Sequence, residues 1–289
     1  MHPVLGARAT EMALAETGAR LAAVDEHLGF AVGEPAGSSW IRLDQVVSDG
    51  WVDRCAEMLV AREGRADVAG SYLGAGLVGP LGLRTVAAIC LDRRAPDPAP
   101  DGVRVHRNAE GGFDGMAFAR PAMAVLPTDA AAGQGGSPGT AVVADLDALV
   151  DWWAERLVAA ATPLIESIRA RLPFGRRCLW GGLADRVAYP PLALARRRGW
   201  DGAAAWAEAT RLIDALARHA PMRFARPKPF TVDWAGGETW FSIKGTCCLR
   251  YRTAPGPDPC GACNCNSCPI LDDAERLARW RAHLERPRG

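Results

Sequence analysis

The cysteines near the C-terminal end restrict this chain more than any other feature. Six of its nine cysteines lie between residues 247 and 268, in the stretch TCCLRYRTAPGPDPCGACNCNSCPI. The surrounding Pro, Gly, Asn and Asp residues follow neither a helical nor a strand period, so the segment cannot build a packed core by itself. We therefore expect a metal centre or crosslinks to hold it.

Composition and the absence of targeting signals indicate whether a metal centre or disulfide crosslinks are favoured. The 289 residues carry a net charge of +1 with basic and acidic residues mixed, which disfavours a nucleic-acid-binding face. No apolar run approaches the ~18–20 residues of a membrane span, and the N-terminal stretch lacks the apolar core of a secretory signal. We expect a cytoplasmic protein without a transmembrane segment. In a reducing cytosol, clustered cysteines more often bind metal or do redox work than form disulfides.

The cysteine spacing admits two kinds of metal site. Two C-x-x-C pairs could bind one tetrahedral zinc ion, namely Cys260 with Cys263 and Cys265 with Cys268. However, a single residue separates these pairs, and Cys247 and Cys248 would stay unused. Neighbouring side chains of an extended chain point to opposite sides, so adjacent cysteines suit a binuclear centre better. The spacing favours a [2Fe–2S] cluster, while a non-enzymatic metalloprotein with a structural zinc tail remains the alternative.

Hydrophobic periodicity predicts an α+β fold that is mostly helical with two short β-hairpins. The cysteine spacing adds a C-terminal Cys-rich [2Fe–2S]-binding segment. Amphipathic patterns indicate helices over 5–30, 50–64, 66–91 with a break at GPLG, 145–172 with a kink or split at Pro163, and onward to about 219. Trp51, Cys55, Met58 and Leu59 should share one helix face. Alternating patterns around NAEGG and AGGE indicate hairpins over 102–119 and 230–245, and a basic amphipathic helix closes the chain.

The loop at 128–139 is the best internal boundary, because its Gly, Ser and Pro residues favour turns. We expect a helical region with a hairpin over 1–139 and a second over 140–245, which together form one unit. Residues 246–289 then form the cluster-binding segment and the closing helix. Three scattered cysteines, Cys55, Cys90 and Cys178, are expected to be small buried side chains.

The cysteine segment resembles a known family. KGTCCLRYR…PCGAC is similar to the C-terminal C-C-x10-C-x2-C signature of the FhuF-type siderophore-iron reductases. RRCLWGGLAD, at 176–185, resembles the Leu-Trp-Gly segment of that family, and SYLGAGLVGPLGL, at 71–83, is less specifically similar. The gap from Leu249 to Pro259 is one residue longer than in the signature, and a surplus C-x-x-C pair follows.

Two ligand sets are therefore open. The first is Cys247, Cys248, Cys260 and Cys263, and the second replaces the last two with Cys265 and Cys268. We favour the first because loop length limits where a ligand can reach.

The resemblance implies an enzyme that reduces Fe(III) in imported ferric siderophores to Fe(II) in the cytoplasm. It implies a [2Fe–2S] cofactor, a ferric siderophore as substrate and a separate electron donor such as a ferredoxin, and it allows peripheral association with a siderophore importer. No dinucleotide-binding fingerprint follows a predicted strand, which agrees with an external donor. A siderophore-synthetase relative is disfavoured because no phosphate-binding loop motif is present.

Several residues near the cysteines have predicted supporting roles. Lys244, Arg250 and Arg252 are expected to tune the cluster potential electrostatically, unless they form only a solvated basic loop. The segment Trp180–Gly182 either lines the siderophore site or forms a packed turn at a helix start. Trp234 and Trp240 are expected to shield the cluster from water.

Overall fold

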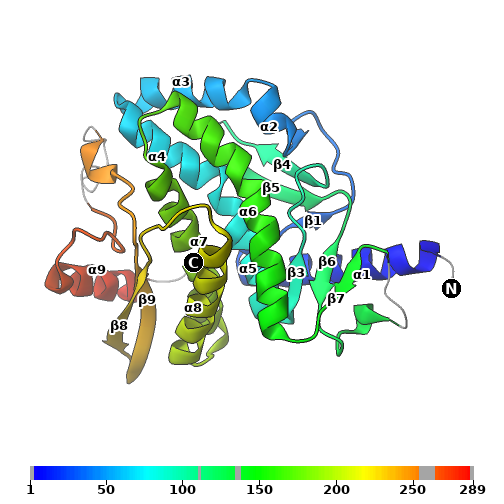
Figure 1. The fold of residues 1–289 in the computed structure, drawn as a ribbon. Coiled ribbons are helices and arrows are strands. Elements are labelled where there is room, and N and C mark those ends of the chain that lie inside the picture. Colours follow the sequence, from blue (N-terminus) through cyan, green and yellow to red (C-terminus); the bar gives the residue numbers. More distant parts are fainter. Residues whose placement is uncertain (1–2, 110–111, 134–137, 254–263, 287–289) are drawn as a thin grey trace.

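The computed structural model describes residues 3–109, 112–133, 138–253 and 264–286. Its architecture is α+β, as predicted, with long helices around the centre and small sheets at the periphery (Figure 1). One hydrophobic cluster takes buried residues from both sides of the 128–139 loop.

The N-terminal part of the chain is helical: α1 spans Pro3–Val24, η1 Glu26–Leu28, α2 Gln45–Ser48, α3 Trp51–Glu63, α4 Ala66–Leu77 and α5 Gly79–Asp92. The predicted break at GPLG is confirmed, since Pro80 stands in the first turn of α5, where its missing N–H costs no hydrogen bond. On α3, Cys55 and Leu59 are buried as expected. Met58, predicted on the same face, is 36% exposed.

The stretch Ala66–Asp92, which contains α4 and α5, is long and apolar enough to cross a membrane by length and composition alone. This differs from the expectation that no run would be long enough. In the fold, 72% of its most apolar window is buried inside the protein. The same apolar composition is what a helix in the middle of a protein core requires.

Two small sheets lie beside these helices. β1 (Ala31–Val32), β2 (Trp40–Arg42), β4 (Val103–Arg107) and β5 (Phe113–Phe118) form a sheet in the order β1-β5-β4-β2. The predicted hairpin is confirmed as the antiparallel β4–β5 pair, with Val105 opposite Met116. The second sheet has the order β3-β6-β7, from Arg94–Pro96, Met123–Val125 and Thr140–Val142, with η2 at Ala130–Ala132. β7 pairs with β6 across the 128–139 loop, so this loop joins two neighbouring strands.

Three long helices follow: α6 at Leu146–Arg171, α7 at Arg176–Arg198 and α8 at Gly202–His219. α6 continues through Pro163 as one helix, so the expected split does not occur. Trp153 of α6 is fully buried and donates from Nε1 to Thr85 Oγ1 of α5 at 2.8 Å. α7 is the central helix, because it contacts α4, α5, α6, α8 and strand β9.

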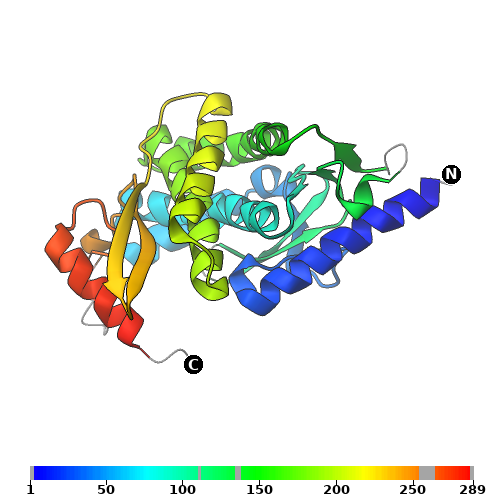
Figure 2. The ribbon, with the colours of Figure 1, turned by 90° about the horizontal axis from the view of Figure 1, so that it is seen from below.

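The second predicted hairpin is also confirmed, as β8 (Lys228–Trp234) and β9 (Gly237–Ile243). Its turn places Ala235 and Gly236 at positive φ, the backbone conformation of a tight hairpin turn. η3 spans Arg250–Arg252 and the closing helix α9 spans Asp273–Glu285. Figures 1 and 2 show the hairpin between α9 on its outer side and α7 and α8 on its inner side. The end of β9 thereby carries the cysteines to the side of α7.

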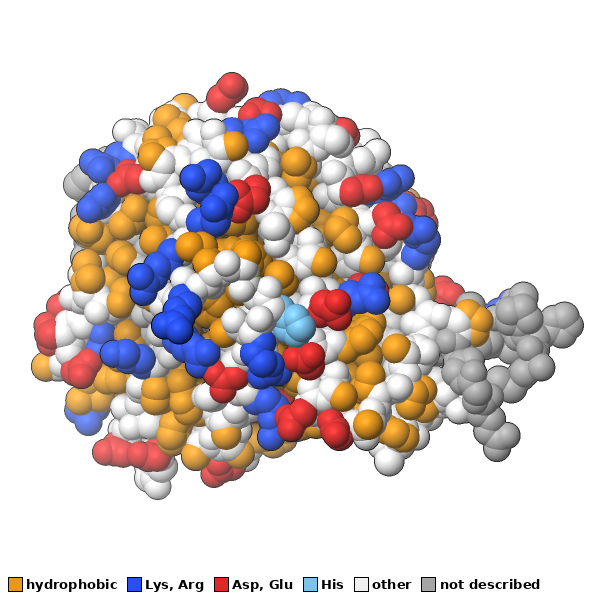
Figure 3. Space-filling model, viewed as in Figure 1, with side chains coloured by type: hydrophobic (Ala, Val, Ile, Leu, Met, Phe, Trp, Pro, Cys, Tyr) orange, Lys and Arg blue, Asp and Glu red, His pale blue; other side chains and the backbone are white. Residues whose placement is uncertain are grey.

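The surface shows no face of a single charge in the view of Figure 3. Acidic and basic side chains are interspersed there, with more of the basic ones over the half of the molecule that contains α7, α8 and the hairpin. This agrees with the near-neutral composition.

Candidate metal centre

A short turn after β9, which we call the cysteine turn (residues 244–249), positions the first two cysteines. Asp185 of α7 accepts hydrogen bonds from the backbone N–H groups of Gly245, at 2.7 Å, and Thr246, at 3.3 Å. The turn lies so close to α7 that a Cβ on Gly181 would be 2.1 Å from Thr246 Oγ1, so the absence of a side chain at Gly181 permits this packing. Sequence analysis did not identify Asp185, since only tertiary packing brings it to residues sixty positions away.

The turn presents Cys247 and Cys248 differently. The Sγ of Cys248 lies 4.0 Å from the Sγ of Cys265, whereas the Sγ of Cys247 accepts the backbone N–H of Leu249 at 3.4 Å. Leu249 has φ of 60°, a left-handed conformation uncommon for a non-glycine residue. Such strain persists only where the surroundings hold it, and it is frequent at functional sites.

The second pair of cysteines lies on the segment that precedes α9. Lys244 N–H donates to the carbonyl of Ser267 at 2.9 Å and so ties this segment to the cysteine turn. Arg276 of α9 is only 2% exposed and donates from Nη2 to the carbonyls of Cys268, at 2.9 Å, and Leu271, at 2.5 Å. The closing helix therefore holds Cys268 in place through a buried guanidinium that the sequence did not single out.

Charge and burial make the four thiols unequal. The pKa of Cys265 is lowered, first by its hydrogen bond with Cys248 and further by Lys244, whose Nζ lies 3.6 Å from its Sγ. The same hydrogen bond raises the pKa of Cys248, because Cys248 keeps the shared proton. Burial raises the pKa of Cys268, and the neighbouring Cys247 adds to the shift. The sulfurs of Cys248 and Cys265 are thus in contact, and Cys268 interacts with both Cys247 and Cys265.

The three predicted tuning cations lie in different surroundings. Lys244 is in contact with Cys265, as described above. Arg252 is turned toward α4, where it forms an ion pair with Asp67 at 2.7 Å. Arg250 begins η3, and its backbone N–H interacts with Cys248. The side chain of Lys244 donates a hydrogen bond to a cysteine sulfur.

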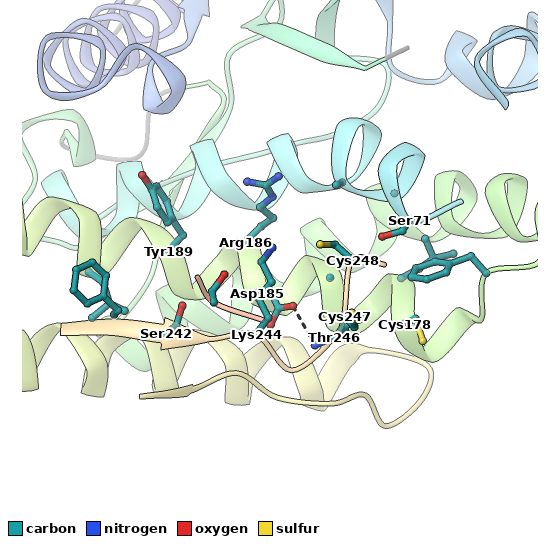
Figure 4. A pocket seen from close by; sticks show the side chains of 18 of the residues that line it. Ser71, Cys178, Asp185, Arg186, Tyr189, Ser242, Lys244, Thr246, Cys247 and Cys248 are labelled. Atoms are coloured by element: carbon teal, nitrogen blue, oxygen red, sulfur yellow. Dashed lines mark hydrogen bonds between the residues drawn. The ribbon is translucent and has the colours of Figure 1, made fainter. Parts of the chain in front are cut away.

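A pocket of about 280 Å³ opens beside the cysteine turn, and its wall contains Cys247 and Cys248. Figure 4 shows these cysteines near Cys178 and Ser71 at one end and Tyr189 and Ser242 at the other, with Asp185, Arg186 and Lys244 between them. Cys178, expected to be a core residue, instead lines this pocket. A second hollow, of about 400 Å³, lies across the turn, and Cys178, Thr246 and Cys247 line both. The turn is therefore the wall between two pockets.

Burial raises the pKa of Asp185 to about 7, although the N–H groups of Gly245 and Thr246 and the charge of Lys244 act in the opposite direction. The cost of placing a carboxylate here is therefore only partly offset by its hydrogen bonds. Asp185 is a structural clamp whose ionisation affects stability.

The other residues predicted near the cluster lie in different parts of the chain. Cys260 and Cys263 lie outside the described residues. Trp180 is fully buried, which supports its packing role, whereas Gly182 lines the pocket. Trp234 and Trp240 line a separate pocket between the hairpin and the α7–α8 connection, so the expectation that they shield the cysteines is wrong. The tryptophan that lines the pocket beside the cysteines is Trp280 of α9, stacked on Phe241 with ring centroids 3.8 Å apart.

In the part of the chain that the structure describes, no three Cys, His, Asp or Glu side chains converge as a ready single-ion site. Among the described sulfurs, those of Cys248 and Cys265 are in contact. A scan against protein-family models and a search of curated proteins find no match to this chain. The site must therefore be interpreted from its own residues.

Proposed function

We propose that this chain is a ferric-siderophore reductase whose [2Fe–2S] cluster is held by Cys247, Cys248, Cys265 and Cys268. The observation that carries the proposal is the pairing of sulfurs from two segments of the chain. Two sulfurs on one tetrahedral metal, each about 2.3 Å from it, lie about 3.8 Å apart. The Cys248–Cys265 distance of 4.0 Å fits two ligands of one iron.

Cys247 and Cys268 would complete the donor set. Cys268 interacts with Cys247 and with Cys265, so the sulfurs of the two segments act on one another. A [2Fe–2S] cluster needs four thiolates, two on each iron, and these four cysteines supply that number. Between the two ligand sets, the described contacts support the one with Cys265 and Cys268. The set with Cys260 and Cys263 stays a prediction.

The substrate requires a strong reductant. Hydroxamate and catecholate oxygens are hard ligands that hold Fe(III) far more tightly than Fe(II), and each tenfold preference lowers the potential of the complex by about 59 mV for one electron. When bound, a [2Fe–2S] cluster supplies a one-electron carrier whose potential can lie several hundred millivolts below zero. The overall reaction moves one electron from a donor to the ferric iron and yields oxidised donor, Fe(II) and the free siderophore.

The residues of the chain contribute position and charge. Lys244, beside Cys265, offsets part of the negative charge of the thiolates. The cysteine turn lies between two pockets, which allows a substrate on one side and a donor on the other. We propose an external donor such as a ferredoxin and a cytoplasmic location, with the siderophore arriving from an importer.

The decisive experiment is a Cys→Ser series at 260, 263, 265 and 268, scored by iron and sulfide content and by EPR of the dithionite-reduced protein. We expect the variants at 265 and 268 to lose the cluster signal and those at 260 and 263 to keep it, which makes the latter two matched controls. The opposite pattern would assign Cys260 and Cys263 as ligands.

The alternative function has its own signature. A purified protein that is colourless and carries stoichiometric zinc would be a metalloprotein with a structural tail, and the reductase proposal would be wrong. A brown protein that dithionite bleaches, and that then reduces a ferric siderophore trapped with an Fe(II) chelator, would support the proposal.

A further inference from the structure

A pocket near the turn of the β8–β9 hairpin, which we call the tryptophan pocket, is lined by Trp200, Trp234 and Trp240. Its volume is about 240 Å³. Three of the ten tryptophans of the chain thus meet there, one from the α7–α8 connection and one from each strand of the hairpin. The four cysteines proposed as ligands lie outside this lining, so the proposed function gives these three side chains no role.

The tryptophans stand on well-fixed backbone. Trp200 is 46% exposed, yet its N–H donates to the carbonyl of Ala195 at 3.0 Å, and Gly199 ends α7 in the left-handed conformation with φ of 69°. Trp240 lies against the start of α8, where a Cβ on Gly202 would be 2.2 Å from the indole ring. Exposed aromatic side chains that are held in this way lose little entropy when they contact a ligand.

The hairpin that carries two of these tryptophans is acidic near its turn. Residues 229–243 contain Asp233 and Glu238 and no basic residue. The two acids stand directly opposite each other in the strand register, and both are exposed. Like charges at opposite positions of two strands destabilise a hairpin. Since Glu238 also lines the tryptophan pocket, a cation bound there would reduce this repulsion.

One basic side chain, Arg196, also lines the pocket. It donates to the carbonyl of Trp240 at 2.6 Å, and its Cζ lies 4.7 Å from the ring centroid of Phe241. Phe241 and Arg196 both line the pocket beside the cysteine turn. The guanidinium therefore lies in the wall between the two pockets, where a phenylalanine ring and a carbonyl oxygen hold it.

This lining favours a large, soft cation over a metal ion. Mg²⁺ and Ca²⁺ need several oxygen ligands, whereas Glu238 supplies the one carboxylate of the lining that the structure describes. A quaternary ammonium ion spreads its charge over methyl groups and binds aromatic faces, among which tryptophan is the strongest partner. The volume is below the ~300–1,000 Å³ of pockets for drug-sized ligands, so it suits a small ion.

We infer that the tryptophan pocket binds a small quaternary ammonium compound of the choline type. The three tryptophan rings contact its methyl groups, and Glu238 provides the opposite charge. This inference goes beyond the proposed function, because it needs neither a cluster nor reductase activity.

The test compares choline with dimethylbutanol, its neutral isostere, in which a carbon atom replaces the quaternary nitrogen. The two compounds have nearly the same shape and apolar surface, so a difference in affinity measures the effect of the charge. Each is titrated into the purified full-length protein by calorimetry, and saturation-transfer NMR shows whether its methyl groups contact the protein. We expect choline to bind at least about tenfold more tightly than the isostere.

Variants at exposed positions make the test specific. Trp200→Leu removes an aromatic face but keeps an apolar side chain, so it should weaken choline binding about fivefold, whereas Trp200→Tyr should retain most of the affinity. Glu238→Gln should weaken choline binding about threefold, the effect of losing one exposed charge contact. Glu11→Gln is the matched control, because Glu11 is an exposed carboxylate on α1 and its loss changes the net charge equally. It should leave the affinity unchanged.

Three results would overturn the inference: equal affinities for choline and its isostere, no binding of choline, or a loss in Glu11→Gln as large as that in Glu238→Gln. A lipid headgroup carries the same ammonium group, so the protein is also sedimented with phosphatidylcholine vesicles. We expect it to stay in solution, and sedimentation with the vesicles would assign the pocket to a membrane surface instead of a free ligand. None of these measurements depends on iron content, so this inference and the proposed reductase can fail separately.

Discussion

The clamp that Asp185 forms on the cysteine turn leads to a quantitative prediction. Its pKa is raised by burial from 3.8 to about 7 in the folded protein. In the unfolded chain the carboxyl ionises near its ordinary value. Between these values the native state binds one more proton than the unfolded state, so the free energy of unfolding must fall as the pH rises.

The magnitude follows from the two pKa values. From pH 6 to pH 8 the unfolded carboxyl is ionised throughout, whereas the native carboxyl is mostly protonated below 7 and mostly ionised above it. Averaged over these two pH units, the native state therefore holds about half a proton more than the unfolded state, which is equivalent to one full extra proton over about one pH unit. Asp185 alone should lower the free energy of unfolding by about 1.4 kcal/mol between pH 6 and pH 8.

The substitution Asp185→Asn removes this titration. An amide oxygen can still accept one N–H of the cysteine turn, but the other loses its acceptor, which costs about 1 kcal/mol. The variant should therefore be less stable than the wild type by about 1 kcal/mol at pH 6. Because only the wild type loses about 1.4 kcal/mol between pH 6 and pH 8, the variant should be as stable as the wild type, or slightly more stable, at pH 8. Urea unfolding at both pH values, followed by circular dichroism, measures both quantities.

Asp233→Asn is the matched control, because Asp233 is an exposed carboxylate on the β8–β9 hairpin. It should follow the wild-type pH dependence. Parallel pH profiles for the wild type and Asp185→Asn would refute the argument, since they would show that the native carboxyl titrates as in the unfolded chain.

Two further predictions concern the same site. Gly181→Ala should destabilise the protein by about 1–3 kcal/mol, because its Cβ would lie 2.1 Å from a threonine hydroxyl of the cysteine turn. Gly182→Ala should be nearly neutral, because its Cβ would meet nothing within 4 Å, and equal losses of stability in thermal unfolding of the two variants would contradict this reasoning. Lys244→Gln should lower the reduction potential of the cluster, because it removes the cation 3.6 Å from the sulfur of Cys265. Lys228→Gln, an exposed change on β8, should leave the potential unchanged. EPR-monitored redox titration measures both potentials, and an unchanged potential in Lys244→Gln would show that Lys244 does not tune the cluster.

Much of the fold could be predicted because its elements are long or strongly patterned. The break between α4 and α5, the helix at 146–171 and both hairpins follow from proline chemistry, helical spacing and strand alternation. The short strands β1, β2, β3, β6 and β7 were not predicted, since two or three residues are too few for alternation to register. Pro163 did not split its helix, because packing of the surrounding leucines on the core outweighs the lost hydrogen bond.

The sequence by itself determined that thiols are clustered between residues 247 and 268, and that Cys247 and Cys248 are the adjacent members of this cluster. Spacing counts residues along the chain, so it could not show which later cysteines approach them, nor which side chains hold the turn. Those contacts depend on how α7 and α9 pack around the β8–β9 hairpin. Only the tertiary structure brought Asp185 to the cysteine turn, Arg276 to Cys268 and Cys265 to Cys248, because each pair is joined by packing between separate elements rather than by a local pattern.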